Sequence, residues 1–250
     1  MGAFRRRNTD SPGRPVDGPA QAVARQARLA KFGIMTARLE VIVGPMFSGK
    51  TERLISRLHR AQYARKRVRI LKPAHDTRTQ GTIASRAVNP DGSIEVTATL
   101  SAMMVRNAAD FARAIADDEY DVLAVDEAQF FPLDEPMADS LGWFGRAIRE
   151  LLRAKAKTEL RIIIAGLDMD FAEAPFGPIP GLLAMADSVE KLTGVCMICG
   201  SDGGYISHRI IPGAKQLVVG DAGEYQVRCR ACYEAPGIRG AVEGGKAAAQ

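Results

Sequence analysis

The chain has 250 residues, of which 46% are apolar and 25% are charged, so it has room for one large globular domain with a small additional module. No apolar run approaches the roughly 18 residues that a membrane-spanning helix needs. Residues 1–34 hold seven basic and two acidic side chains, so their net charge of +5 equals the formal net charge of the whole chain. The net charge of residues 35–250 is therefore zero, and this part lacks the basic excess typical of nucleic-acid binders.

Residues 1–34 are rich in Gly, Pro, Ala and Arg, and they lack the apolar core of a secretory signal. This composition predicts a disordered extension rather than a folded segment or a targeting signal. A start codon assigned too far upstream is the alternative, because Met35 stands just before the first predicted strand.

A strand is predicted at residues 38–44 and an amphipathic helix at residues 51–64. Between them, GPMFSGKT matches the pattern G-x-x-x-x-G-K-[ST] in the strand-then-helix context that phosphate-binding loops require. In such a loop the backbone N–H groups and the helix dipole face phosphate oxygens, the lysine contacts the outer phosphates, and the threonine ligates Mg²⁺. A glycine-rich turn without a ligand is the alternative. The residues predicted to bind ATP and Mg²⁺ here are Gly44, Pro45, Met46, Phe47, Ser48, Gly49, Lys50 and Thr51.

A second strand is predicted at residues 67–73, followed by an irregular segment with the turn signal VNPDGS and by a helix at residues 106–118. The nearly continuous apolar run at residues 120–127 predicts a buried strand of a parallel sheet. Asp126 and Glu127 end this run, at the carboxyl edge of the sheet beside the phosphate loop. We expect Asp126 to hold Mg²⁺ and Glu127 to act as a general base; a solvated turn is the alternative.

Four more elements complete the alternation of strands and helices. They are a helix at residues 140–156, a strand at 160–167, a short helix through Leu182–Met185 and a strand at 187–193. This β-α order predicts an α/β fold with a parallel sheet and helices on both of its faces.

The four cysteines form two close pairs, Cys196-x-x-Cys199 and Cys229-x-x-Cys232. Each pair presents two thiolates on one turn, and four thiolates close a tetrahedral zinc site without an open position for substrate. We therefore predict a structural Zn²⁺, with four unconnected thiols as the alternative. Cysteines this sparse do not form a disulfide scaffold and indicate a reduced, cytoplasmic setting.

The 29 residues between the cysteine pairs are rich in Gly and contain Tyr205 and Tyr225. A loop of this length predicts a lid over a small substrate, and a zinc-stapled stabilising hairpin is the alternative. Because the composition changes beyond Gly194, we expect a P-loop α/β domain at residues 35–193, a zinc and lid module at 194–236, and a flexible tail at 237–250.

Several motifs in order give the chain a family resemblance: GPMFSGKT, KPAHDTR, VDEAQFF, PFG, the two C-x-x-C pairs and CRACY. Together they resemble the cytosolic-type thymidine kinases over residues 37 to about 234. The resemblance implies a RecA-like P-loop domain with a small zinc domain that carries a lasso-like lid loop. It also implies ATP with Mg²⁺ and thymidine as substrates, phosphorylation of the 5′-hydroxyl, a cytoplasmic homotetramer, and neither nucleic acid nor membrane as a partner.

The resemblance also implies roles for single residues. Glu127 would take the proton from the 5′-hydroxyl, and Asp76 and Arg78 of the D-T-R segment would lie near the phosphates and metal. In the lid, GGYISHR and GDAGEYQ depart from the usual forms, which leaves either Ile206 or Ser207 at the usual Thr position. Six other residues would line the nucleoside pocket, although the residues alone favour core packing for them. They are Met46, Phe130, Leu167, Phe171, Phe176 and Tyr225.

A P-loop ATPase acting on nucleic acid, with the cysteines in a zinc ribbon, is the competing prediction. The neutral body, the single α/β domain and the missing second motor lobe disfavour it. A nucleotide-binding regulatory module without catalysis is a third prediction.

Overall fold

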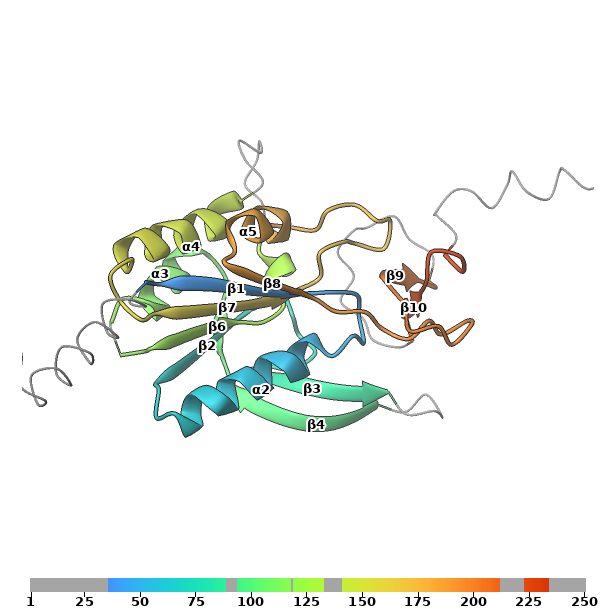
Figure 1. Cartoon of the computed structure of the whole chain (residues 1–250), viewed down its shortest axis with the longest axis horizontal. Coiled ribbons are helices and arrows are strands. Elements are labelled where there is room, and N and C mark those ends of the chain that lie inside the picture. Colours follow the sequence, from blue (N-terminus) through green and yellow to red (C-terminus); the bar gives the residue numbers. More distant parts are fainter. Residues whose placement is uncertain (1–35, 89–93, 118, 133–140, 212–222, 234–250) are drawn as a thin grey trace, which may run out of the picture. The chain divides into compact units, whose positions relative to one another are not determined.

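In the computed structural model, the described residues are 36–88, 94–117, 119–132, 141–211 and 223–233. Their centre is a six-stranded sheet in the order β5-β2-β6-β7-β1-β8, and all neighbouring strands in it are parallel (Figure 1). The strands are β1 (Arg38–Val43), β2 (Val68–Pro73), β5 (Met103–Val105), β6 (Val122–Val125), β7 (Arg161–Gly166) and β8 (Ser188–Lys191). The predicted α/β class with a parallel sheet is confirmed.

Both faces of the sheet are buried, as its apolar strands require. Along β1, Leu39, Val41 and Val43 belong to one core, whereas Ile42 belongs to the other. The first core lies under α3 (Ala108–Ala114), α4 (Gly142–Ala154) and α5 (Ile179–Met185), and the second lies under α2 (Lys50–Tyr63) (Figure 1). The prediction of helices on both faces is confirmed.

An antiparallel hairpin shares the second face with α2, where the sequence predicts only an irregular segment. Its strands are β3 (Thr82–Val88) and β4 (Ile94–Ser101). Ile83 is 1% exposed and packs in the same core as Leu54 and Leu58 of α2. Apolar and polar residues alternate along β4, from Ile94 to Ser101, which is typical of a half-buried strand, whereas β3 shows no regular alternation. Residues 89–93 of the predicted VNPDGS turn lie outside the described residues.

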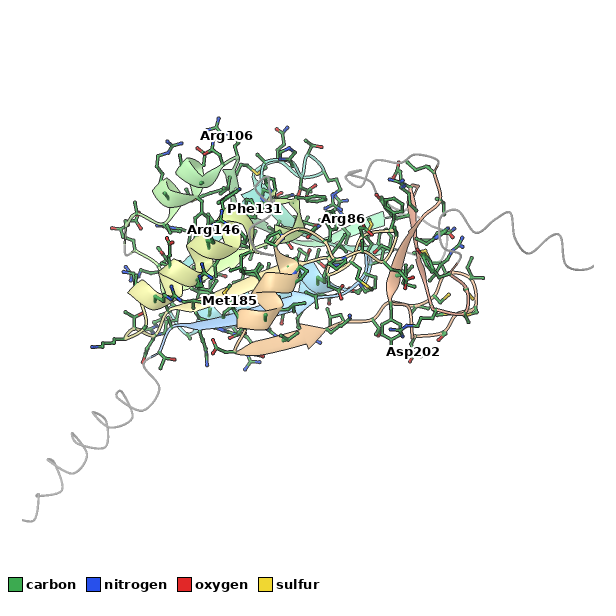
Figure 2. All side chains as sticks on the ribbon, turned by 90° about the horizontal axis from the view of Figure 1, so that it is seen from above. Arg86, Arg106, Phe131, Arg146, Met185 and Asp202 are labelled. Carbon is green, nitrogen blue, oxygen red and sulfur yellow. The ribbon has the colours of Figure 1, made fainter. Side chains whose placement is uncertain are left out.

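An aromatic cluster anchors the short 3-10 helix η1 (Ala128–Phe130) that follows β6. Phe131, which is labelled in Figure 2, stacks on Phe144 of α4 with ring centroids 4.2 Å apart. It also meets Trp143 edge-on, with ring centroids 5.3 Å apart. Phe111 of α3 also packs edge-on against Phe144. These contacts fix the backbone directly after Asp126 and Glu127.

The described residues of the predicted zinc and lid module, called the C-terminal module below, contain a small antiparallel sheet of β9 (Ile206–Arg209) and β10 (Tyr225–Arg228). Two backbone hydrogen bonds, of 2.8 and 2.9 Å, join Gly194 to Gly204 in the segment that precedes β9. The predicted lid loop is described only at its two ends, because residues 212–222 lie outside the described residues. The predicted extension and tail also lie outside them. Among the helices of the described ranges, none is long and apolar enough to cross a membrane.

Candidate active site

The phosphate loop joins β1 to α2, and its backbone takes conformations that favour glycine. Gly44 has a φ of +147° and Gly49 a φ of +80°. A Cβ atom on Gly44 would lie 2.5 Å from the carbonyl oxygen of Leu192, so a side chain there would collide with the chain leaving β8. The loop therefore passes close to the chain that leaves the neighbouring strand, and Met46, Phe47 and Gly49 of the loop line a cavity.

Lys50 extends from the first turn of α2 back over this loop. Its side chain is 9% exposed, and Nζ donates a hydrogen bond of 2.6 Å to the carbonyl oxygen of Pro45. Burial lowers the pKa of Lys50, and the negative charges of Glu127, Asp126 and Asp168 only partly offset this effect. A phosphate group beside Nζ would supply the compensating negative charge.

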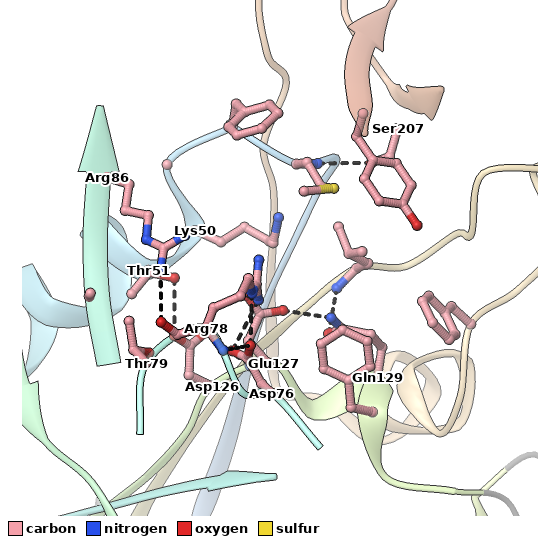
Figure 3. Close-up of a pocket in the computed structure, with 18 of the residues that line it drawn as sticks. Lys50, Thr51, Asp76, Arg78, Thr79, Arg86, Asp126, Glu127, Gln129 and Ser207 are labelled. Atoms are coloured by element: carbon pink, nitrogen blue, oxygen red, sulfur yellow. Dashed lines mark hydrogen bonds and ion pairs between the residues drawn. The ribbon is translucent and has the colours of Figure 1, made fainter. Parts of the chain in front are cut away.

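Thr51 and Asp126 present two oxygen atoms to the same point. The Thr51 hydroxyl donates to Oδ2 of Asp126 at 3.0 Å (Figure 3). The backbone N–H of Asp126 donates to the carbonyl oxygen of Leu71 at 3.1 Å. Burial, together with the charge of Glu127, raises the pKa of Asp126 to about 7. Hydroxyl and carboxylate oxygens are ligands that Mg²⁺ prefers, so this pair fits a magnesium ion bound with a nucleotide.

Glu127 occupies a left-handed backbone conformation with a φ of 54°, which is uncommon for a residue other than glycine. Its Oε1 accepts a hydrogen bond from Arg78 at 2.5 Å, and its Oε2 accepts one from Gln129 at 2.6 Å (Figure 3). Burial raises the pKa of Glu127, but the positive charges of Arg78 and Lys50 lower it, and the net result is a pKa below the ordinary value. The carboxylate is therefore ionised, which is the form that accepts a proton.

Arg78 is held by two carboxylates. Its Nε and a terminal nitrogen donate to the two oxygens of Asp76 at 2.7 and 3.0 Å, in addition to the contact with Glu127. Asp76 is 2% exposed and Arg78 is partly buried, and both side chains line the cavity of the site. Burial lowers the pKa of Arg78, but the two carboxylates raise it above its ordinary value, so the guanidinium keeps its charge.

Gln129 connects the ends of two neighbouring strands, a role that the sequence does not reveal beyond its place in VDEAQFF. Its amide nitrogen donates to Glu127, and its oxygen accepts from the backbone N–H of Leu167 at 3.0 Å. The site therefore orients the predicted base from one side by Gln129 and from the other by Arg78.

A single cavity runs from the phosphate loop to an apolar chamber, and all six residues of the predicted nucleoside pocket line it. Phe130 and Phe176 meet edge-on with ring centroids 6.1 Å apart. Lys50, Thr51, Asp76, Arg78, Asp126 and Glu127 line the other end, whereas Gly44, Pro45 and Ser48 do not reach the cavity. Lining residues that sequence reasoning missed include Thr79, Ser85, Arg86, Gln129, Met169 and Asp170. Two of them, Ser85 and Arg86, belong to β3 of the hairpin, where the sequence predicts an irregular segment.

The C-terminal module reaches the cavity through Ser207 and Tyr225. The Ser207 hydroxyl accepts a hydrogen bond of 2.9 Å from the backbone N–H of Met46 in the phosphate loop (Figure 3). The sequence leaves either Ile206 or Ser207 at the usual Thr position of the lid. Of these two residues, Ser207 lines the cavity and Ile206 does not. The guanidinium of Arg209 lies 3.7 Å from the ring centroid of Phe171, which ties the module to the wall of the chamber.

The four cysteines of this module form one cluster. Their Sγ atoms all lie within 4.8 Å of one another, and those of Cys199 and Cys229 are 3.8 Å apart. A tetrahedral zinc with Zn–S bonds of about 2.3 Å requires S–S separations of about 3.8 Å. Four thiols at these separations can hold a structural metal ion, and the donor set fits Zn²⁺.

Gly177, in the motif PFG, supports the position of Gln129 and provides a stability test. Its φ is +54°, and a Cβ atom would lie 2.4 Å from the carbonyl oxygen of Gln129. We expect Gly177→Ala to destabilise the fold by about 2 kcal/mol or more, because backbone strain and a clash combine. Gly200→Ala is the matched control, since Gly200 has a φ of +74° with nothing within 4 Å of the added carbon. Thermal denaturation would contradict the argument if both variants lost the same stability.

Three features define this chain as a P-loop protein of the α/β class. A phosphate loop follows β1, and an acid at the end of β6 lies beside the threonine of that loop. One cavity joins both of them to an apolar chamber. A family model described as "Thymidine kinase" matches residues 37–233. This chain therefore belongs to the thymidine kinase family.

Curated relatives agree with this assignment. The protein named "Thymidine kinase" from Bacteroides fragilis is 40% identical over 198 residues, which are 79% of this chain and 87% of that protein. The one from Bacteroides thetaiotaomicron is 41% identical over 197 residues, or 78% of this chain and 86% of that protein. The one from Porphyromonas gingivalis is 40% identical over 201 residues, covering 80% and 86%.

Proposed function

We propose that this protein transfers the γ-phosphate of ATP to the 5′-hydroxyl of thymidine, giving thymidine monophosphate and ADP. The observation that carries the proposal is the single cavity, which places an ionised, oriented carboxylate between a phosphate loop and an apolar chamber. Membership of the thymidine kinase family supports the choice of nucleoside.

Different residues have different roles in the proposed reaction. Thr51 and Asp126 would hold Mg²⁺, which neutralises charge on the β- and γ-phosphates when it is bound. Lys50 contacts the same phosphates, and Arg78 offsets charge on the transferring group. Glu127 accepts the proton of the 5′-hydroxyl as its oxygen bonds to the γ-phosphorus and the bond from that phosphorus to the bridging oxygen of ADP breaks.

The apolar walls favour a small, flat base. Phe130, Phe176 and Tyr225 are each less than a tenth exposed, and all three line the cavity. A thymine ring buries its faces and its methyl group against such walls, while lid backbone groups bind its polar edge. The departures in the lid sequence then affect the contacts with the base and leave the phosphoryl transfer unchanged.

Three further parts of the proposal concern the assembled protein. The four clustered cysteines bind a structural Zn²⁺, since four thiolates leave no position for substrate. The reduced thiols that this site needs suit a cytoplasmic location. The family resemblance favours a homotetramer, which light scattering of the purified protein would test.

The experiment is a phosphorylation assay with thymidine, deoxyuridine, deoxycytidine and deoxyguanosine, and with single-stranded DNA in a separate arm. We expect ADP release to depend on thymidine and to be weaker with the other nucleosides. Turnover that responds to DNA and not to thymidine would contradict the proposal and favour a nucleic-acid ATPase. ATP binding without any turnover would favour a regulatory module.

A further inference from the structure

Lys72 is a buried cation that the mechanism above does not use. It lies near the end of β2 and is 2% exposed. Its Nζ is 2.8 Å from Oδ2 of Asp76 and donates to the carbonyl and hydroxyl oxygens of Thr79 at 2.9 and 2.5 Å. A fourth contact of 3.3 Å reaches the carbonyl oxygen of Thr82. A buried ammonium is costly unless it is paired and hydrogen-bonded, and every contact here goes to the segment that carries Arg78.

The contacts of Asp76 continue this arrangement toward the reaction centre. Its Oδ2 is shared by Lys72 and a terminal nitrogen of Arg78, and its Oδ1 accepts from both the backbone N–H and Nε of Arg78. Arg78 then spans Asp76 and Glu127 (Figure 3). The order Lys72, Asp76, Arg78, Glu127 therefore alternates positive and negative charge from the end of β2 to the predicted base.

We propose that Lys72 is a positioning residue for phosphoryl transfer, which acts by holding Asp76 and its loop so that the Arg78 guanidinium faces the phosphates. The inference rests on the proposed function for its kinetic consequences. Lys72 binds the loop at Thr79 and Thr82 as well as at Asp76, so it fixes both the carboxylate and the path of the chain around it. A guanidinium held in advance loses little conformational freedom when the charge on the transferring group develops.

A purely structural anchor would behave differently. Its loss would lower the melting temperature, while the folded enzyme would keep its kcat and its ATP affinity. The positioning role instead predicts that the effect of removing Lys72 passes through Arg78, so the two substitutions should not add.

The test is a double-mutant cycle with Lys72→Met, Arg78→Met and the double variant. We expect Lys72→Met to lower kcat by about 100-fold with the thymidine KM nearly unchanged, since its contacts lie away from the apolar walls. The double variant should lose no more kcat than Arg78→Met alone. Arg161→Met is the control, because it breaks ion pairs with the buried Glu40 on the second face and should lower stability without lowering kcat.

Affinity for a non-hydrolysable ATP analogue, measured by calorimetry, gives a second readout that needs no nucleoside. If the wild type makes no thymidine monophosphate, the proposed function fails. The positioning role of Lys72 is then still tested by measuring the analogue affinity of the same single and double variants. If Lys72→Met does not fold, Asp76→Asn replaces it in the cycle, because Asn keeps the side-chain shape but removes the charge that pairs with Lys72 and Arg78. The losses in Asp76→Asn and Arg78→Met should likewise not add. Additive losses, or wild-type kcat and analogue affinity in Lys72→Met, would overturn the proposal.

Discussion

Replacing Glu127 with Gln is expected to lower kcat for thymidine phosphorylation by about 1,000-fold, within the range that a general base contributes. Gln keeps the size of the side chain and an oxygen that accepts from Arg78, but it cannot take the proton of the 5′-hydroxyl. ATP affinity should change little, because Lys50, Thr51 and Asp126 remain in place. Steady-state kinetics with calorimetry of ATP binding would measure both quantities.

Glu159→Gln is the matched control for this variant, because Glu159 is an exposed acid whose described ion pair is with Lys66, at 3.2 Å. It should keep the wild-type kcat. A kcat near that of the wild type in Glu127→Gln would exclude Glu127 as the base. Loss of ATP binding in that variant would instead assign it to the nucleotide site.

Replacing Cys196 with Ser is expected to remove the bound zinc and to unfold the C-terminal module. Structural zinc contributes on the order of 10 kcal/mol to the folding of small metal-bound modules, and Cys196 is the most buried of the four thiols. Because the module carries Ser207, Arg209 and Tyr225, we expect a large rise in the thymidine KM with a smaller effect on ATP affinity. Elemental analysis and kinetics would measure the two effects.

Ile198→Ser is the control, since Ile198 lies between the first two cysteines, is 57% exposed and offers no thiol. It should retain one zinc per chain and wild-type kinetics. Zinc retained in Cys196→Ser, or a wild-type protein that contains none, would contradict the assignment of this cluster.

The order of the elements follows from local sequence patterns, and most of it could be predicted. Strands of a parallel sheet that is buried on both faces are nearly all apolar, as at residues 161–166, so they stand out from the amphipathic helices. The hairpin of β3 and β4 could not be predicted in this way. It has no continuous apolar run, because apolar and polar residues alternate along β4 and follow no regular pattern along β3. Ile83 packs in the same core as α2, a contact that forms only in the folded chain.

The candidate site shows the same division between local and long-range information. Lys50 and Thr51 belong to a motif read from adjacent residues, and the end of β6 marks Asp126. The contact between Arg78 and Glu127 joins residues 49 apart in sequence, and Lys72 reveals its partners only once the loop after β2 is folded around it. Such contacts depend on the register of neighbouring strands and the path of a loop, neither of which local composition encodes.

The nucleoside pocket lies between these cases. Phe130 and Phe176 are buried, as core packing would predict, yet the same side chains line the cavity. Burial in the protein and contact with a ligand are satisfied by one arrangement, so the residue types alone do not distinguish the two. Whether these residues bind a base stays a prediction that substrate kinetics must test.

The most direct test of the account is to identify the products formed from ATP and thymidine by the purified protein, using phosphorus NMR and mass spectrometry. We expect thymidine 5′-monophosphate and ADP in equal amounts, with no ADP formed when thymidine is omitted. ADP formed at the same rate without thymidine, or no phosphorylated nucleoside at all, would contradict it.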